Sequence, residues 1–133
     1  MKFKTLVLIL LFTSVSFTGF SQSHDKIKTD LVKTFVSGKS TTLDAYFEGF
    51  VSVQLPDHSG LFPATRSKIY LETFLKNHPV KKFSLKKSGT TGNNYFLIGL
   101  LECHSASWNV YFLFSPDKGN YKIQQIEIEE SEK

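Results

Sequence analysis

The chain has 133 residues, of which 41% are hydrophobic and 21% charged, and its formal net charge is +4. This length is enough for one domain with its own core. The charge is not concentrated into the basic footprint that nucleic-acid binding needs, so we expect no nucleic-acid partner. The only cysteine, Cys103, excludes an internal disulfide and is expected to be a buried free thiol.

Residues 1–21 have the pattern of a cleavable secretory signal. Lys2 and Lys4 precede an apolar run, and small residues up to Ser21 suit a cleavage site. Polar residues interrupt the run before it reaches the roughly 18 to 20 apolar residues of a spanning helix, so we expect no stable membrane insertion after cleavage. The sequence predicts export to the periplasm or the cell exterior. It also predicts a single domain over residues 22–133, with 14 basic and 12 acidic residues.

Two amphipathic helices are predicted at the start of this domain. Apolar residues recur every three or four positions in the first helix, which Ser23 can cap and Gly38 can end. A short second helix is expected over residues 42–47, with Thr41 or Thr42 as its cap. Both helices have one apolar face and therefore need a surface to pack on.

Two strands and a third helix follow. Alternating apolar residues predict a strand over residues 50–55, and a short returning strand is expected at residues 61–62. The third helix is expected to begin at the cap Thr65 and to stop before Pro79. His78, at its end, is expected to cap free carbonyl groups rather than to bind a ligand.

Four consecutive antiparallel strands are predicted for the last third of the chain. Turn residues separate the strand near residues 83–85 from those at 95–105, 108–114 and 121–128. Turns this short leave no room for parallel crossovers. Lysines flanking the first of these strands are expected to protect a sheet edge, and the glutamates near the C-terminus to solvate a frayed tail.

The two middle strands of this meander are predicted to be apolar on both faces. Apolar residues occupy both sets of alternating positions, for example Leu97 and Ile98 in one strand and Phe112 and Leu113 in the other. An antiparallel sheet covered by helices on one side normally has polar residues on the other. We therefore expect a second copy to cover the free face, giving a homodimer through the sheet. The alternative is that sheet curvature and the chain's own termini hide that face.

The predicted order of elements is similar to that of the nuclear transport factor 2-like superfamily, which has a cystatin-like cone fold. Several phrases also resemble a family of secreted Bacteroidetes proteins known as domain of unknown function 4783. These phrases are residues 35–39, 43–47, 74–79, 111–114 and 121–129. The resemblance implies an α+β cone with three N-terminal helices packed on a curved, mainly antiparallel sheet, in the order α-α-β-β-α-β-β-β-β. It implies no particular activity, because the wider superfamily contains both enzymes and binding modules.

Few residues are candidates for a functional site. Glu102 and His104 lie two apart on a predicted strand and are the nearest approach to an acid/base pair, although we expect them to be the solvent-facing end of a strand beside a turn. Tyr46, Tyr70 and Tyr111 offer hydroxyl groups to a small ligand in the cone, or are simply core residues. No catalytic or metal-binding motif of recognised spacing occurs, so we assign no catalytic residue and expect no cofactor or metal.

The sequence therefore predicts a small secreted domain that acts as a non-catalytic binding or assembly module in homodimeric form. Two alternatives remain open. One is a small isomerase or dehydratase that uses the cone pocket, and the other is a protein–protein interaction module without a ligand cavity. Asp57 and His58, between Pro56 and Gly60, are expected to form a turn and not a catalytic pair.

Overall fold

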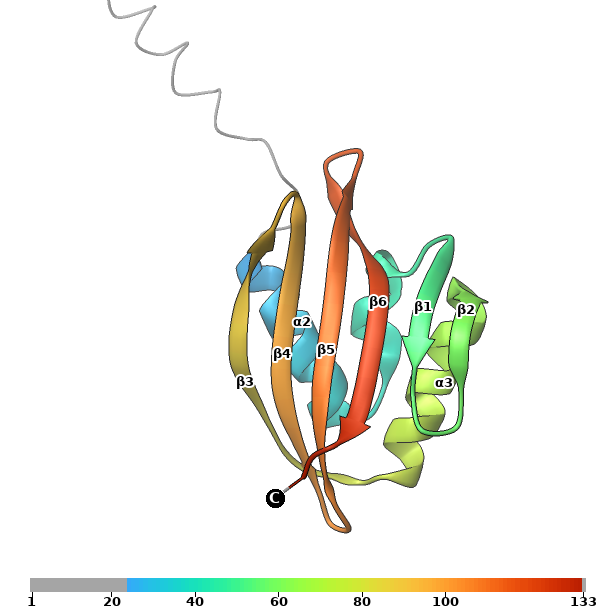
Figure 1. Ribbon diagram of the computed structural model, residues 1–133, viewed down its shortest axis with the longest axis vertical. Helices are drawn as coiled ribbons and strands as arrows, with labels where there is room; N and C mark the ends of the chain where they lie inside the picture. The colour runs from blue at the N-terminus through green and yellow to red at the C-terminus, as the bar shows by residue number, and fades with distance from the viewer. Residues whose placement is uncertain (1–23, 133) are drawn as a thin grey trace, which may run out of the picture.

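A computed structural model describes residues 24–132 of the chain (Figure 1). The predicted signal sequence and the predicted cap Ser23 lie outside these residues. The described elements, in chain order, are α2 (His24–Ser37), the 3-10 helix η1 (Ser40–Tyr46), β1 (Phe50–Gln54), β2 (Ser59–Pro63), α3 (Ala64–Asn77), β3 (Val80–Thr91), β4 (Asn94–Cys103), β5 (Ser107–Asp117) and β6 (Asn120–Glu130). The fold class is α+β, as expected. The description of three N-terminal helices is wrong, because α3 lies between β2 and β3.

The six strands form one curved sheet in the order β2-β1-β6-β5-β4-β3. The strands β3 to β6 pair antiparallel in sequence order, which confirms the predicted meander. The contact between β1 and β6 is the one parallel pair of this sheet. In Figure 1, α2 and α3 lie behind the sheet, α2 behind the half formed by β3 to β5 and α3 behind β1 and β2. Helices therefore cover one face of the sheet.

The core lies between this covered face and the helices. Alternate residues of β4, β5 and β6 point into it, and they are Tyr95, Leu97, Leu101, Trp108, Val110, Phe112, Phe114, Ile123, Ile126 and Ile128. From α2, Ile27, Leu31 and Phe35 pack against them and are no more than 1% exposed. The helical period of three and four residues thus places one stripe of α2 on the sheet.

The start of α3 differs from the prediction. Thr65 does not cap it, because the helix begins one residue earlier, at Ala64, directly after Pro63. Proline has a fixed φ suited to a helix start, and the backbone N–H of Ala64 donates to the carbonyl oxygen of Gly49 at 2.8 Å. The predicted cap at the other end is confirmed, since His78 Nδ1 lies 2.9 Å from the carbonyl oxygen of Phe74.

The second helix is a 3-10 helix that no threonine side chain caps. Lys39 precedes it and makes no side-chain cap bond. Thr42 instead lies within η1, and its Oγ1 bonds Thr34 Oγ1 at 2.6 Å and the carbonyl oxygen of Asp30 at 3.2 Å. Thr42 therefore joins η1 to α2. Gly38, which was expected to end α2, does so in the left-handed conformation with φ of 73°.

Two predictions about the last third need correction. The strand β3 extends to Thr91, so the turn into β4 is tighter than expected, with Gly92 at φ of 62°. The glutamates near the C-terminus do not form a frayed tail, because β6 continues to Glu130 and pairs with β5 as far as Trp108. The strand β3 is a sheet edge, as its lysines indicated. Within residues 24–132, no helix has the length and apolar character needed to cross a membrane.

Candidate functional site

The face of the sheet away from the helices carries a patch of apolar side chains. Its members alternate with the core residues of β4 and β5, and we call them the outer patch: Phe96, Ile98, Leu100, Tyr111 and Leu113. All five are half-buried, because they shield one another across the two strands. None belongs to the apolar residues that pack against the core. In Figure 1 no helix lies in front of this part of the sheet.

Strand register places the outer patch between a basic side and an acidic side. Lys87 on β3 pairs with Ile98, Ile98 pairs with Tyr111, and Tyr111 pairs with Glu127 on β6. Directly paired residues point to the same face of a sheet. One row across the outer face therefore reads lysine, isoleucine, tyrosine, glutamate. Neither charged residue belongs to an ion pair of the described part of the chain.

The acidic side holds two carboxylates on the same face of β6. Gln125 Nε2 donates to Glu127 Oε2 at 3.3 Å, and Gln54 Nε2 donates to Glu129 Oε1 at 3.0 Å. Burial raises the pKa of the Glu127 carboxyl, and the hydrogen bond and charge of Glu129 raise it further. The two carboxylates border a small hollow of about 240 Å³ beside Ile98 and Tyr111. A cation approaching the outer face would relieve their repulsion.

The structure does not bring the three candidate tyrosines together. Tyr46 is completely buried, and its hydroxyl donates to Asp30 Oδ2 at 2.7 Å instead of reaching water. Burial and Asp30 both raise the pKa of this hydroxyl. Tyr70 lies on α3 and stacks on His58, with ring centroids 3.7 Å apart. Tyr111 lies on the opposite face of the sheet from Tyr46, so the three hydroxyls cannot line one cone pocket.

Glu102 and His104 do not share a strand face. Because β4 ends at Cys103, Glu102 is half-buried on the outer face, whereas His104 is exposed in the turn to β5. His104 borders an open hollow of about 700 Å³ together with Glu130. Cys103 is the expected buried free thiol, and burial raises its pKa. The expected turn at Asp57 and His58 is present, since both lie in the connection between β1 and β2.

Sequence reasoning missed Asp30, which organises the contacts between α2 and η1. Its carboxylate accepts a hydrogen bond from Tyr46 and pairs with Lys26 Nζ at 2.7 Å. Lys26 and Asp30 are four residues apart, a spacing that predicts an ion pair on a helix. The contact with Tyr46 has no such local signal. Among residues 24–132, no cluster of three or more His, Cys, Asp or Glu side chains is placed to hold a metal ion.

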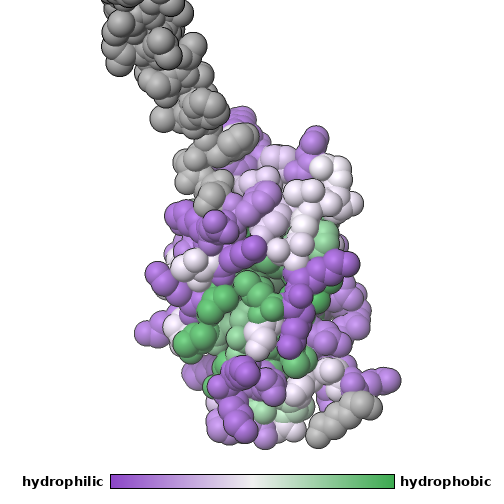
Figure 2. All heavy atoms as spheres, turned by 90° about the vertical axis from the view of Figure 1, so that its left-hand side faces the viewer, coloured by the Kyte–Doolittle hydropathy of each residue, from purple (hydrophilic) through white to green (hydrophobic). Residues whose placement is uncertain are grey.

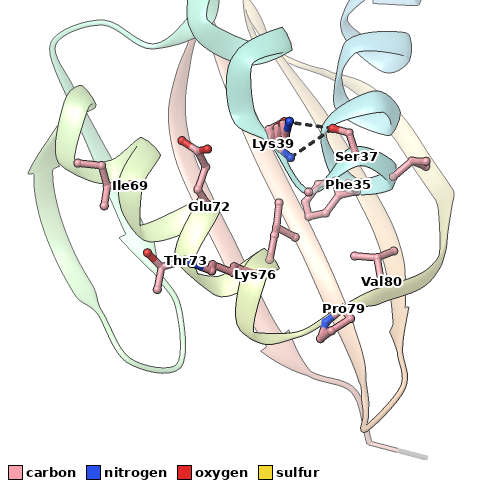
Figure 3. Close-up of a pocket in the computed structure, with 12 residues that line it drawn as sticks. Phe35, Ser37, Lys39, Ile69, Glu72, Thr73, Lys76, Pro79 and Val80 are labelled. Carbon is pink, nitrogen blue, oxygen red and sulfur yellow. Dashed lines mark hydrogen bonds between the residues drawn. The ribbon is translucent and has the colours of Figure 1, made fainter.

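A second surface feature is a groove between the end of α2, the helix α3 and the start of β3 (Figure 3). It has a volume of about 590 Å³ and is lined by apolar residues such as Phe35 and Val80, with the charged Glu72 and Lys76 from α3. Figure 2, which views the molecule from the β3 side, shows hydrophobic surface gathered in one area with hydrophilic residues around it. The ionisable residues among those that line the groove are Lys39, Glu72 and Lys76.

The curved six-stranded sheet with helices on one face has the α+β fold of nuclear transport factor 2-like proteins. More particularly, the chain belongs to the family described as domain of unknown function (DUF4783), whose profile matches residues 28–129. Solved structures of two relatives support this. The protein from Bacteroides ovatus is 20% identical with a TM-score of 0.72, covering 78% of this chain and 94% of its own. The protein from Bacteroides uniformis is 23% identical with a TM-score of 0.72, covering 79% and 97%.

The wider class is also represented among the similar structures. An NTF-2 like protein of unknown function from Silicibacter pomeroyi is 9% identical with a TM-score of 0.55, covering 78% of this chain and 89% of its own. Identities this low show a shared fold only. No curated protein matched the chain. The function has therefore to be argued from the surfaces described above.

Proposed function

We propose that this protein is a non-catalytic assembly module that acts as a homodimer joined through the outer patch. The observation that carries the proposal is the apolar character of both faces of β4 and β5. Side chains on the inner face meet helices, whereas Ile98, Leu113 and their neighbours on the outer face have no helix in front of them.

A second copy is the simplest cover for such a face. Antiparallel sheets packed on one side normally expose polar residues on the other, and contiguous apolar patches on soluble proteins mark interfaces. A twofold dimer uses the same patch on both subunits, so one apolar face is sufficient. The alternative that the C-terminal segment hides this face finds less support, because β6 is itself a strand of the sheet and pairs with β5 as far as Glu130 opposite Trp108.

The cone interior supports a non-catalytic role. Enzymes that use such a pocket need an ionisable group beside a free donor, with room for the substrate. Here Phe35, Phe112 and Phe114 fill the space between α2 and the sheet and are fully buried. Tyr46 packs against Phe114 in this layer, and the carboxylate of Asp30 that its hydroxyl reaches already pairs with Lys26. A filled interior of this kind favours a binding or assembly role over the isomerase or dehydratase alternative.

The dimer is tested by placing a charge in the outer patch. Leu113→Asp should weaken dimerisation at least tenfold in sedimentation velocity, because a carboxylate cannot be buried there without a partner. The matched control is Ile69→Asp, because Ile69 is also apolar and is 59% exposed. Ile69 belongs to α3, which lies on the opposite side of the sheet from the outer patch. Circular dichroism checks that both variants fold. A wild-type protein that stays monomeric at high micromolar concentration contradicts the proposal.

We also propose that the domain works after export, on the pattern of residues 1–21. This proposal rests on sequence alone and is independent of the dimer. Mass spectrometry of the protein purified from its own cells would show a mass lacking about 21 residues. Recovery of the uncleaved chain from the cytoplasm would exclude export.

A further inference from the structure

We propose further that the two copies are related by a twofold axis parallel to β4 and β5, so that Lys87 of each copy lies opposite Glu127 of the other. This inference rests on the proposed dimer and specifies how its two sheets are oriented. It follows from the order of charges across the outer face, which the strand register determines.

The row through the centre of the patch is self-complementary about such an axis. Its members are Lys87, Ile98, Tyr111 and Glu127, in adjacent strands from β3 to β6. Rotation about an axis that lies over the line between β4 and β5, parallel to them, reverses the order of strands but keeps the position along each strand. Ile98 then lies over Tyr111 of the second copy, and Lys87 over Glu127. Two ion pairs thus flank an apolar centre.

The other aligned arrangement is electrostatically unfavourable. An axis in the plane between the sheets but perpendicular to the strands places each strand over its own copy. The acidic face of β6, with Glu127 and Glu129, would then oppose itself, and the basic edge β3 would do the same. Like charges that face each other at an interface oppose association. Within one copy, burial and then the neighbouring Glu129 already raise the pKa of Glu127.

Packing geometry allows the favoured pairing. Sheets pack face to face about 10 Å apart with strand directions within roughly 30° of each other. Lysine has a flexible four-carbon stem and can reach across a displacement of a few ångströms. In the same copy, Lys87 and Glu127 are separated by three strand spacings, or about 14 Å. That distance exceeds the Debye length of about 8 Å at physiological salt, so direct coupling between them within one copy is weak.

A charge-swap experiment tests the pairing. Lys87→Glu and Glu127→Lys each create two like-charge contacts per dimer, and each should raise the dimer Kd about tenfold at low salt. The double variant restores both ion pairs with the signs exchanged and should return to within about threefold of the wild-type Kd. Lys33→Glu, at an exposed position on α2, changes the net charge by the same amount as Lys87→Glu and should leave the Kd unchanged.

The outcomes separate this inference from the proposed function. A monomeric wild-type protein overturns both. A wild-type dimer that neither single variant weakens leaves the dimer standing and overturns the axis. Weakening by both single variants without recovery in the double variant also overturns the axis, because the effect is then additive and not a contact between the two residues. The proposed axis is supported only if both single variants weaken the dimer and the double variant restores it.

Discussion

Gly99 is a position where a single methyl group should destabilise the fold measurably. A Cβ atom placed there would lie 2.6 Å from the Cζ atom of the Phe83 ring and 3.1 Å from the carbonyl oxygen of Ser84. The Phe83 ring cannot retreat freely, since it stacks on the buried Phe35 ring with centroids 4.4 Å apart. The absence of a side chain at Gly99 therefore lets Phe83 lie flat between β4 and α2.

We expect Gly99→Ala to lower the free energy of unfolding by about 1 to 3 kcal/mol, the usual cost of overpacking a core. For a domain of this size, each kcal/mol corresponds to a fall in Tm of about 4 to 8 °C. Urea denaturation should show a lower midpoint with an unchanged m value, because the surface exposed on unfolding stays the same.

Two further variants locate the cause. Gly89→Ala is the matched control, since its Cβ would lie 3.1 Å from the ring of Phe96, which is only half-buried and lies on the outer face, away from the core. Its unfolding free energy should stay within about 0.5 kcal/mol of wild type. Phe83→Leu shortens the side chain that clashes, so Gly99→Ala should cost less in that background. A Gly99→Ala variant as stable as wild type, or an equal cost in both backgrounds, refutes the reasoning.

The remaining predictions concern Tyr46 and Glu127. Tyr46→Phe should lower the free energy of unfolding by about 1 kcal/mol, because Asp30 loses one hydrogen bond but keeps its ion pair with Lys26. Urea denaturation measures this change. An unchanged midpoint would show that the hydrogen bond does not stabilise the fold. The dimer should weaken as pH falls from 7 toward the ordinary glutamate pKa of 4.5. Burial and Glu129 raise the pKa of Glu127 in the free copy, whereas the proposed contact with Lys87 favours the charged form, so association releases protons and strengthens with rising pH. Glu127→Gln should reduce the pH dependence of the dimer Kd, although the neighbouring groups Glu129, Tyr111 and Gln54 remain in place. An unchanged pH dependence in that variant would contradict the assignment to Glu127.

Local patterns in the sequence predicted most of the fold. The three- and four-residue spacing of α2 and the alternation in β4 and β5 determine which side chains share a face, because backbone geometry repeats with those periods. Turn residues marked the ends of the strands for the same local reason. The sequence pattern also predicted that both faces of β4 are apolar, and this prediction identified the outer patch as the candidate surface.

Local patterns gave wrong predictions where contacts between distant segments decide at which residue a helix or strand begins or ends. Thr65 has the chemistry of a helix cap, yet the bond from Ala64 to Gly49 starts α3 one residue earlier. Glu102 and His104 have the spacing of one strand face, but β4 ends between them.

The amino-acid sequence by itself determined the class of the fold, the order of its elements and the apolar nature of the outer patch. Only the tertiary structure decided that Tyr46 is bound to Asp30 and that Lys87 and Glu127 lie at the two ends of one row. Spacing along the chain sets the direction of each side chain within its own element. Strand pairing over long sequence distances sets which elements become neighbours, and chemistry at a surface depends on those neighbours.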